Sequence, residues 1–265
     1  MSRRLALYLG AAFAITWGAW GTLAALARSD ALRYGEPRFM ALYILGGLGP
    51  MIAAYLAIIA TRSATPLREF HLRLLRWRVA RSWYLFALFV PIALALASVA
   101  IALVFERGLW ASLAVRPWYL FAAYFLTTII GGGLEEPGWR GVAQPELQRW
   151  LSPGWAAVAV AAAWAPWHLP LFFIPGVAQY GGSFVEFAIG ILGTSLLLGW
   201  LYARTQSVLL CVIFHASANA SALMGIAVPD EGGLLTSIGA IVNVAAGLAL
   251  FVLRNPQTGA RAIEE

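Results

Sequence analysis

Residues 118–141 have the sequence WYLFAAYFLTTIIGGGLEEPGWRG, a long apolar run that ends in two glutamates and an arginine. A helix of about 20 apolar residues is long enough to cross the hydrocarbon core of a bilayer. Charged side chains in or beside such a helix cost free energy, so they normally face the interior of a helix bundle and have a function there. Glu135, Glu136 and Arg140 are therefore the first candidates for a functional site.

The composition of the whole chain is typical of a membrane protein. Of its 265 residues, 61% are hydrophobic and only 11% are charged, and the mean hydropathy is +0.77. Soluble domains carry about a quarter charged residues. The net charge of +6 comes from scattered arginines, which favours anionic lipid headgroups as partners and argues against nucleic acid. The single cysteine, Cys211, excludes a disulfide within the chain.

Several segments are apolar and long enough, or nearly long enough, to span a membrane. They are Leu5–Ala27, Phe39–Ala60, Trp83–Phe105, Trp118–Leu134, Trp155–Ile174, Phe184–Ala203, Ser207–Ala227 and Leu234–Leu253. We therefore predict an all-α polytopic membrane protein, a single transmembrane domain over residues 1–265 with about eight helices in one bundle. The fourth segment is the shortest, and it spans fully only if its helix continues through Glu135 to Arg140.

The arginines indicate an orientation. Most of them lie in the segments that alternate with apparently outer loops, such as 175–182 and 228–233, which carry no arginine. The positive-inside rule then places both termini in the cytoplasm. Arginine is the only strongly basic residue and alanine is abundant. This composition indicates a multi-pass protein of a bacterial inner or plasma membrane.

The basic segment at residues 67–82 has the sequence LREFHLRLLRWRVARS. Its apolar residues occur at helix-like spacing with arginines between them. We predict an amphipathic helix that lies on the membrane surface, with the arginines reaching toward lipid phosphates. A merely solvated basic connector is the alternative. His71 belongs to this segment, and no catalytic role is assigned to it.

The glutamate pair combines two environments. Glu136 and Arg140 are four residues apart, with the acid first, and on a helix they are placed to form an ion pair. Glu135 projects about 100° away from Glu136 and lacks such a partner. One glutamate is therefore expected to be neutralised structurally while its neighbour stays available for chemistry. The alternative is a helix end that carries ordinary charges.

Two further polar groups lie inside apolar segments. His168 occurs between Pro166 and Pro170, so we predict that the helix is kinked or loosened beside it. His215 and Asn219 are one turn apart and share a helical face. A single buried histidine is more often a packed core residue than a catalyst. Together with the glutamates, however, these groups can supply a water-activating base, a second acid or base and oxyanion donors.

A cysteine nucleophile and a divalent metal site are two other kinds of site that these residues could form. Cys211, His215 and Asn219 lie on one helical stripe, but a lone cysteine in a membrane helix is usually a small packing residue. A cysteine nucleophile is therefore not predicted. Glu135, His168 and His215 would be the ligands if the site held a divalent metal such as zinc. The zincin pattern H-E-x-x-H is absent, and the cofactor prediction is either none or such a metal.

The polar residues resemble the three motifs of the CPBP intramembrane proteases, which include the CAAX endopeptidase and bacterial relatives of the Abi type linked to bacteriocin immunity. The matching motifs are Glu135-Glu136-x-x-x-Arg140, Trp164-x-x-x-His168 and His215-x-x-x-Asn219. Their order and spacing agree with the family, and the likeness runs from the basic segment near Leu67 to about Ser221. The catalytic core is expected at about residues 118–227. Trp164 is a departure, because the family more often has phenylalanine there.

The resemblance implies an intramembrane endopeptidase that hydrolyses a peptide bond near the cytoplasmic membrane face. Glu135 would activate a water molecule with the help of His168, and His215 and Asn219 would stabilise the oxyanion. Glu136 and Arg140 would support the site as an ion pair. The substrate would be a peptide or protein, with lipid-modified and transmembrane chains both open.

Other functions remain as alternatives. The same buried polar cluster could bind a partner in a non-catalytic immunity or scaffold protein, or relay protons in a transporter, although no inverted repeat is visible. The enzyme hypothesis requires the polar residues to converge. His215 lies about 12 Å from the cytoplasmic start of its segment and His168 about 20 Å from that of its own. The two imidazoles therefore meet only if helices tilt or protrude.

Overall fold

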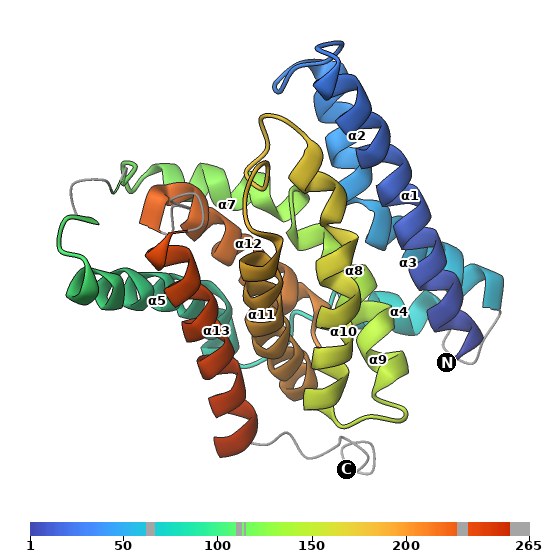
Figure 1. The fold of residues 1–265 in the computed structure, drawn as a ribbon. Helices are drawn as coiled ribbons and strands as arrows, with labels where there is room; N and C mark the ends of the chain where they lie inside the picture. The colour runs from blue at the N-terminus through green and yellow to red at the C-terminus, as the bar shows by residue number, and fades with distance from the viewer. Residues whose placement is uncertain (62–66, 110–112, 114, 227–232, 255–265) are drawn as a thin grey trace.

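The computed structural model describes residues 1–265 except 62–66, 110–112, 114, 227–232 and 255–265, and the described residues form helices and no strand (Figure 1). The longer helices are α1 (Arg3–Arg28), α2 (Pro37–Gly47), α3 (Gly49–Thr61), α4 (Leu67–Leu74), α5 (Arg81–Phe105), α7 (Leu120–Ile130), α10 (Pro153–Trp167), α11 (Phe184–Thr205), α12 (Val208–Ser221) and α13 (Leu234–Leu253). Short helical pieces join them: η1 (Gly133–Glu135), α8 (Glu136–Gly138), η2 (Trp139–Ala143), α9 (Gln144–Leu147), η3 (Leu169–Phe173) and η4 (Ala222–Ile226).

The all-α membrane prediction is confirmed, but the number of spans is not. Within the described residues, six helices are long and apolar enough to cross a membrane, and α2 with α3, bent by 46°, makes a seventh candidate. The predicted span Trp118–Leu134 contains only the 11-residue α7, about 16 Å long. Gly131 ends this helix, and the chain continues through Glu135 to Arg140 as short 3-10, α and π segments.

The basic segment forms a shorter helix than predicted. Helix α4 ends at Leu74, and α5 begins at Arg81. Phe70 of α4 is fully buried, and its ring packs on Tyr55 of α3 with the centroids 5.3 Å apart. The segment is thus docked on the protein through its apolar side, and contact of its arginines with lipid stays a prediction.

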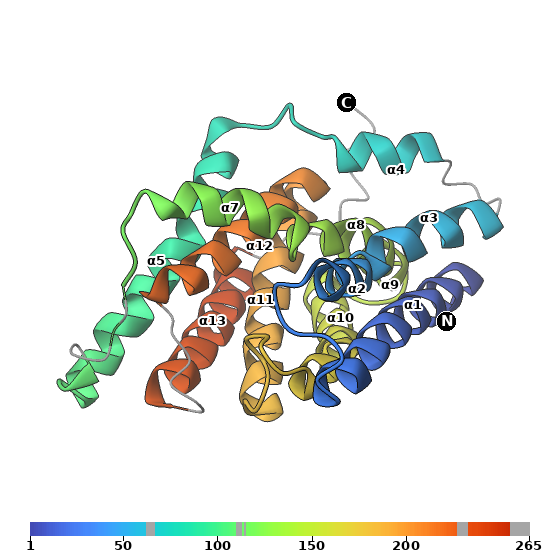
Figure 2. The same ribbon diagram turned by 90° about the horizontal axis from the view of Figure 1, so that it is seen from above.

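Helices α13, α11, α10 and α1 form a row in the view of Figure 1, and α12, α7 and α5 lie behind the left part of it (Figures 1 and 2). The outer helices of this row, α1 and α13, are each held by a contact at one terminus. Arg4 pairs with Glu146 at 3.1 Å at the start of α1, and Trp200 near the end of α11 donates to the carbonyl of Arg254 just after α13. The start of α1 and the end of α13 therefore lie at one end of the bundle. Which membrane face this end meets stays a prediction.

Helices α11 and α13 run parallel and approach each other closely through glycines. A Cβ atom on Gly193 would lie 2.6 Å from the backbone nitrogen of Val244, and one on Gly247 would lie 2.6 Å from Cβ of Leu196. Small residues that allow backbones to approach are the usual basis of helix association in membranes, where no hydrophobic effect acts between helices. These two glycines hold together the pair of helices that forms one wall of the site described below.

Replacing Gly193 with alanine should therefore destabilise the protein by about 1–3 kcal/mol, because the added methyl group meets backbone atoms that must move. Gly21→Ala in α1 is the matched control, since a Cβ there meets nothing within 4 Å, and alanine favours a helix more than glycine does. Thermal unfolding of the detergent-solubilised protein measures both. Equal midpoints for the two variants would contradict the packing role of Gly193.

Candidate active site

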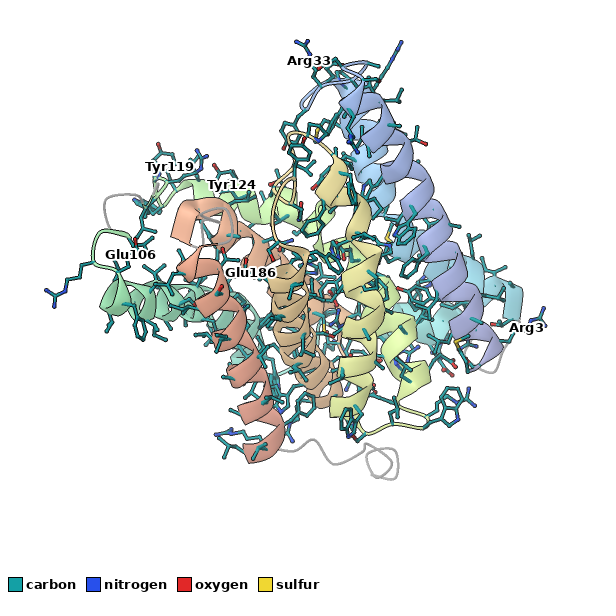
Figure 3. The ribbon with its side chains drawn as sticks, viewed as in Figure 1. Arg3, Arg33, Glu106, Tyr119, Tyr124 and Glu186 are labelled. Carbon is teal, nitrogen blue, oxygen red and sulfur yellow. The ribbon has the colours of Figure 1, made fainter. Side chains whose placement is uncertain are left out.

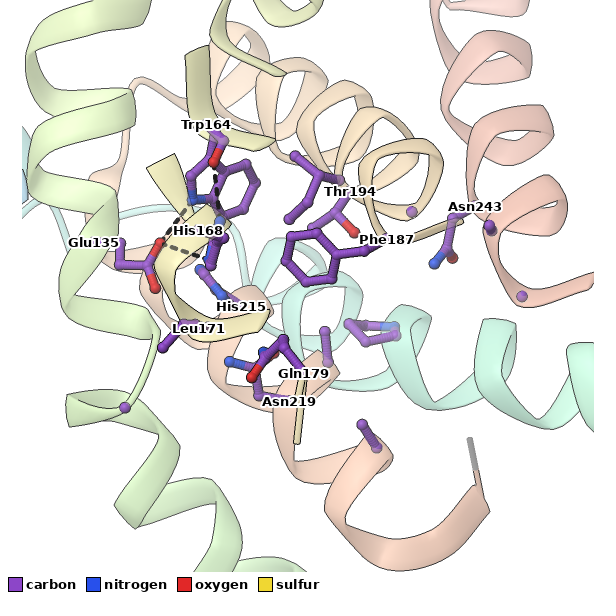
Figure 4. Close-up of a pocket in the computed structure, with 18 of the residues that line it drawn as sticks. Glu135, Trp164, His168, Leu171, Gln179, Phe187, Thr194, His215, Asn219 and Asn243 are labelled. Carbon is purple, nitrogen blue, oxygen red and sulfur yellow. Dashed lines mark hydrogen bonds and ion pairs between the residues drawn. The ribbon is translucent and has the colours of Figure 1, made fainter. Parts of the chain in front are cut away.

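A cavity of about 360 Å³ lies where α10, α11, α12 and α13 meet α5 and the turn η1. Glu135, His168, His215 and Asn219 all line it, and Figure 4 shows their side chains gathered in one part of the cavity. The convergence required by the sequence hypothesis is thus present in the structure. Glu136 and Arg140, in contrast, do not line the cavity and lie fully buried behind it.

Glu135 lies in the 3-10 turn η1 and is buried, with 6% of the residue exposed. The indole Nε1–H of Trp164 donates to Oε2 of this carboxyl group at 2.7 Å. The same oxygen is 3.9 Å from Nε2 of His168, which is too long for a direct hydrogen bond. A water molecule that contacts both atoms at ordinary hydrogen-bond distance fits this separation.

The environment of Glu135 also alters its acidity. The residue lies outside the candidate membrane-spanning helices, and burial raises the pKa of its carboxyl group from 4.5 to about 7. The nearby His215 and the hydrogen bond from Trp164 oppose this effect, because both favour the charged form. A carboxyl group with a pKa near neutrality is suited to take up and release a proton.

His168 lies at the point where α10 ends and the 3-10 helix η3 begins, so the predicted loosening between Pro166 and Pro170 is confirmed. Its Nδ1 is 2.9 Å from the carbonyl oxygen of Trp164. A carbonyl oxygen only accepts hydrogen bonds, so Nδ1 carries the proton. In the neutral ring Nε2 is then the acceptor, and this is the atom that faces Glu135.

The ion pair predicted from the spacing of Glu136 and Arg140 is confirmed. The guanidinium Nη1 lies 3.1 Å from a carboxylate oxygen, and both side chains are 0% exposed. The second guanidinium nitrogen, Nη2, donates to Ser195 of α11 at 3.0 Å, and the group lies over the ring of Trp164, 4.7 Å from its centroid. The pair therefore joins η2, α10 and α11.

Glu136 has a further partner that the sequence did not predict. Nδ1 of His215 donates to its Oε1 at 2.8 Å, which fixes the ring and turns Nε2 away from the ion pair. A carboxylate that accepts from one nitrogen of a histidine sets the tautomer and stabilises the protonated ring, as in hydrolase triads. Glu136 thus positions His215 in addition to neutralising Arg140.

Gly132 lets the backbone approach the third motif. A Cβ atom at this position would overlap Nδ2 of Asn219 and lie 3.0 Å from Nε2 of His215. The two nitrogens therefore flank the same point of the chain, and both face the space that a side chain at residue 132 would fill. Asn219 Nδ2 is a hydrogen-bond donor, and His215 Nε2 becomes one when the ring is protonated.

Trp164 connects the three motifs, a role that its position in the second motif did not by itself predict. It is fully buried, and its indole binds Glu135, its carbonyl binds His168 and its ring meets that of His215 at 5.4 Å. The three motifs thus share one aromatic residue. Phenylalanine could make the ring contacts but has no N–H to donate.

The sequence also raised a cysteine nucleophile and a metal site as possibilities. Cys211 is buried, does not line the cavity, and has its sulfur 3.8 Å from the carbonyl oxygen of Leu198, as a packing residue would. The residues that the structure describes contain no group of three His, Cys, Asp or Glu side chains placed to hold a metal ion. Glu135, His168 and His215 therefore do not form a three-ligand metal site in this structure.

Comparison with known proteins agrees with the three motifs. Residues 117–221 match the family described as type II CAAX prenyl endopeptidase Rce1-like, and this range includes every residue of the three motifs. The chain is also 24% identical over 257 residues to the CAAX prenyl protease 2 of Methanococcus maripaludis, which covers 92% of this chain and 93% of that protein. Both matches support the CPBP or CAAX protease family, so the resemblance based on the motifs is confirmed.

Trp164→Phe should raise the pKa of Glu135 above that of the parent protein, because the lost N–H favours the ionised carboxylate. Infrared titration of the buried carboxyl band measures this midpoint, and its loss in Glu135→Gln identifies the band. Trp20→Phe is the matched control, since Trp20 also lines the cavity but donates to the carbonyl of Tyr43. A midpoint that is unchanged or lower in Trp164→Phe would contradict the role of this hydrogen bond.

Proposed function

We propose that this chain, which the comparisons support as a member of the CAAX protease family, hydrolyses peptide bonds with a water molecule activated by Glu135. The observation that carries the proposal is the shared cavity of Glu135, His168, His215 and Asn219. At the general level, the comparisons support an intramembrane endopeptidase. The roles of the individual residues are our proposal.

In the first step, a water molecule lies between Oε2 of Glu135 and Nε2 of His168. Glu135 takes one proton as the water oxygen forms a bond with the scissile carbonyl carbon. The lone pair of His168 Nε2 accepts a hydrogen bond from the same water and orients it. The proton acquired by the carboxylate is later delivered to the leaving amine as the C–N bond breaks, which regenerates the carboxylate.

In the same step, the carbonyl oxygen becomes an oxyanion. Asn219 Nδ2 and Nε2–H of protonated His215 are placed on one side of Gly132 to donate to it. Protonated His215 is balanced by Glu136, whose Oε1 accepts from Nδ1.

The cavity also indicates the kind of substrate. Beyond the catalytic residues its lining includes apolar and small residues of α5, α11 and α13, among them Pro91, Leu94, Gly190 and Leu235. Such a lining suits apolar groups of a chain that enters from the membrane. We propose a peptide or protein substrate that is lipid-modified or membrane-embedded near the scissile bond, cut near the cytoplasmic face as the family resemblance implies.

Glu135→Gln and His215→Ala should each lower peptide cleavage by about 100- to 10,000-fold, the range expected for loss of a general base or an oxyanion donor. Cleavage of a peptide library by the purified protein in nanodiscs, read by mass spectrometry, measures the effect. His71→Ala is the control, because His71 is on α4 and binds Tyr55, away from the cavity.

Cleavage at the parent rate by either cavity variant would show that the residue assignment is wrong. The non-catalytic immunity or scaffold function would be favoured if no peptide is cut by the parent protein while both variants lose a cellular phenotype. Thermal unfolding of each variant separates loss of chemistry from loss of structure.

Activity should persist when the purified protein is treated with a metal chelator, because the described residues offer no three-ligand metal site. Cleavage rates with and without the chelator, together with metal analysis of the same preparation, make the measurement. Loss of activity that is restored by added zinc would contradict a reaction in which Glu135 and His168 alone activate the water.

A further inference from the structure

The part of the cavity that faces away from Glu135 carries polar residues for which hydrolysis has no use. They are Glu186, Thr194, Thr236 and Asn243, and they come from α11 and α13. Figure 4 shows Thr194 and Asn243 extending this lining away from the catalytic residues. Glu186 is the one carboxylate of this set.

Glu186 is held in a defined place. Its Oε1 accepts from the hydroxyl of Ser237 on α13 at 2.7 Å, and its other oxygen has no hydrogen-bond partner among the described residues. The carboxylate lies in the first turn of α11, where the helix dipole favours a negative charge. The next residue, Phe187, packs its ring on His168 with the centroids 5.0 Å apart, and Glu186 lines the same cavity as the proposed catalytic groups.

No positive side chain of the described residues pairs with Glu186. The described lining of the cavity contains no arginine, and its charged or chargeable groups other than tyrosine are Glu135, Glu186, His168 and His215. Arg140 lies behind the wall and is paired with Glu136. A negative charge in a cleft with low-dielectric walls attracts cations and repels anions strongly.

We propose that Glu186 forms a subsite for a positively charged group of the substrate, an arginine or lysine side chain near the scissile bond. The free oxygen of Glu186 would accept a charge-assisted hydrogen bond from this group. Acidic side chains are disfavoured in the same part of the cavity. Cleavage of such a peptide rests on the proposed peptidase function, whereas binding of a cationic peptide does not.

The test uses the full-length protein in nanodiscs and a fluorescent apolar peptide in which one position at a time is lysine, norleucine or glutamate. Binding is followed by fluorescence anisotropy and cleavage by mass spectrometry. In the parent protein, lysine should improve binding over norleucine by about tenfold at one or two neighbouring positions. Glutamate should weaken it there, and added salt should reduce the lysine advantage.

Glu186→Gln should remove the lysine advantage. Glu106→Gln is the matched control, because Glu106 follows α5, is exposed and does not line the cavity, and Figure 3 shows it apart from Glu186. The control should keep the advantage. Identical profiles in the parent and Glu186→Gln, or no position in the parent at which lysine improves binding, would overturn the subsite.

The two readouts separate this inference from the proposed function. A lysine advantage in binding that depends on Glu186, without cleavage of any peptide, would support the subsite and contradict the peptidase. Cleavage without any lysine advantage would support the peptidase and overturn the subsite. Absence of both binding and cleavage would overturn both.

Discussion

The buried ion pair of Glu136 and Arg140 is the constraint on which both the fold and the site depend. Neither side chain is exposed, and removal of one partner from such a pair leaves an uncompensated charge at a cost of several kcal/mol. Further hydrogen bonds join the pair to Ser195 on α11 and His215 on α12. Helices far apart in the sequence must therefore pack in one arrangement for these charges to be satisfied.

This constraint explains why two adjacent glutamates have different roles. Glu136 is committed to Arg140 and His215, whereas Glu135 accepts from Trp164 and faces the cavity. Glu135 avoids the ion pair because the chain passes through the 3-10 turn η1 immediately after α7. The same break that removes a full-length membrane span from the fold thus places a carboxyl group at the cavity.

The sequence predicted the features that depend on local spacing. Apolar length gave most of the spanning helices, the four-residue interval gave the pair of Glu136 and Arg140, and the flanking prolines gave the helix end at His168. Contacts between segments far apart in the sequence could not be predicted in this way. The bond from Trp164 to Glu135 joins residues 29 apart and that from His215 to Glu136 joins residues 79 apart. Only the packing of the helices brings them together, and no periodicity encodes it.

The orientation of the bundle in the membrane stays a prediction from the arginines. The cavity reaches Glu186 and Leu235 in the first turns of the parallel helices α11 and α13, the end opposite to the start of α1. It also extends to Leu197 in the middle of α11 and His215 in the middle of α12. The arginine rule counts charges in loops, yet much of the basic segment is docked: Phe70 is buried, and the carbonyl of Arg76 accepts from Ser207. Since a substrate must reach Glu135 through the cavity, the membrane face toward which the cavity opens decides from which side a peptide bond is cut.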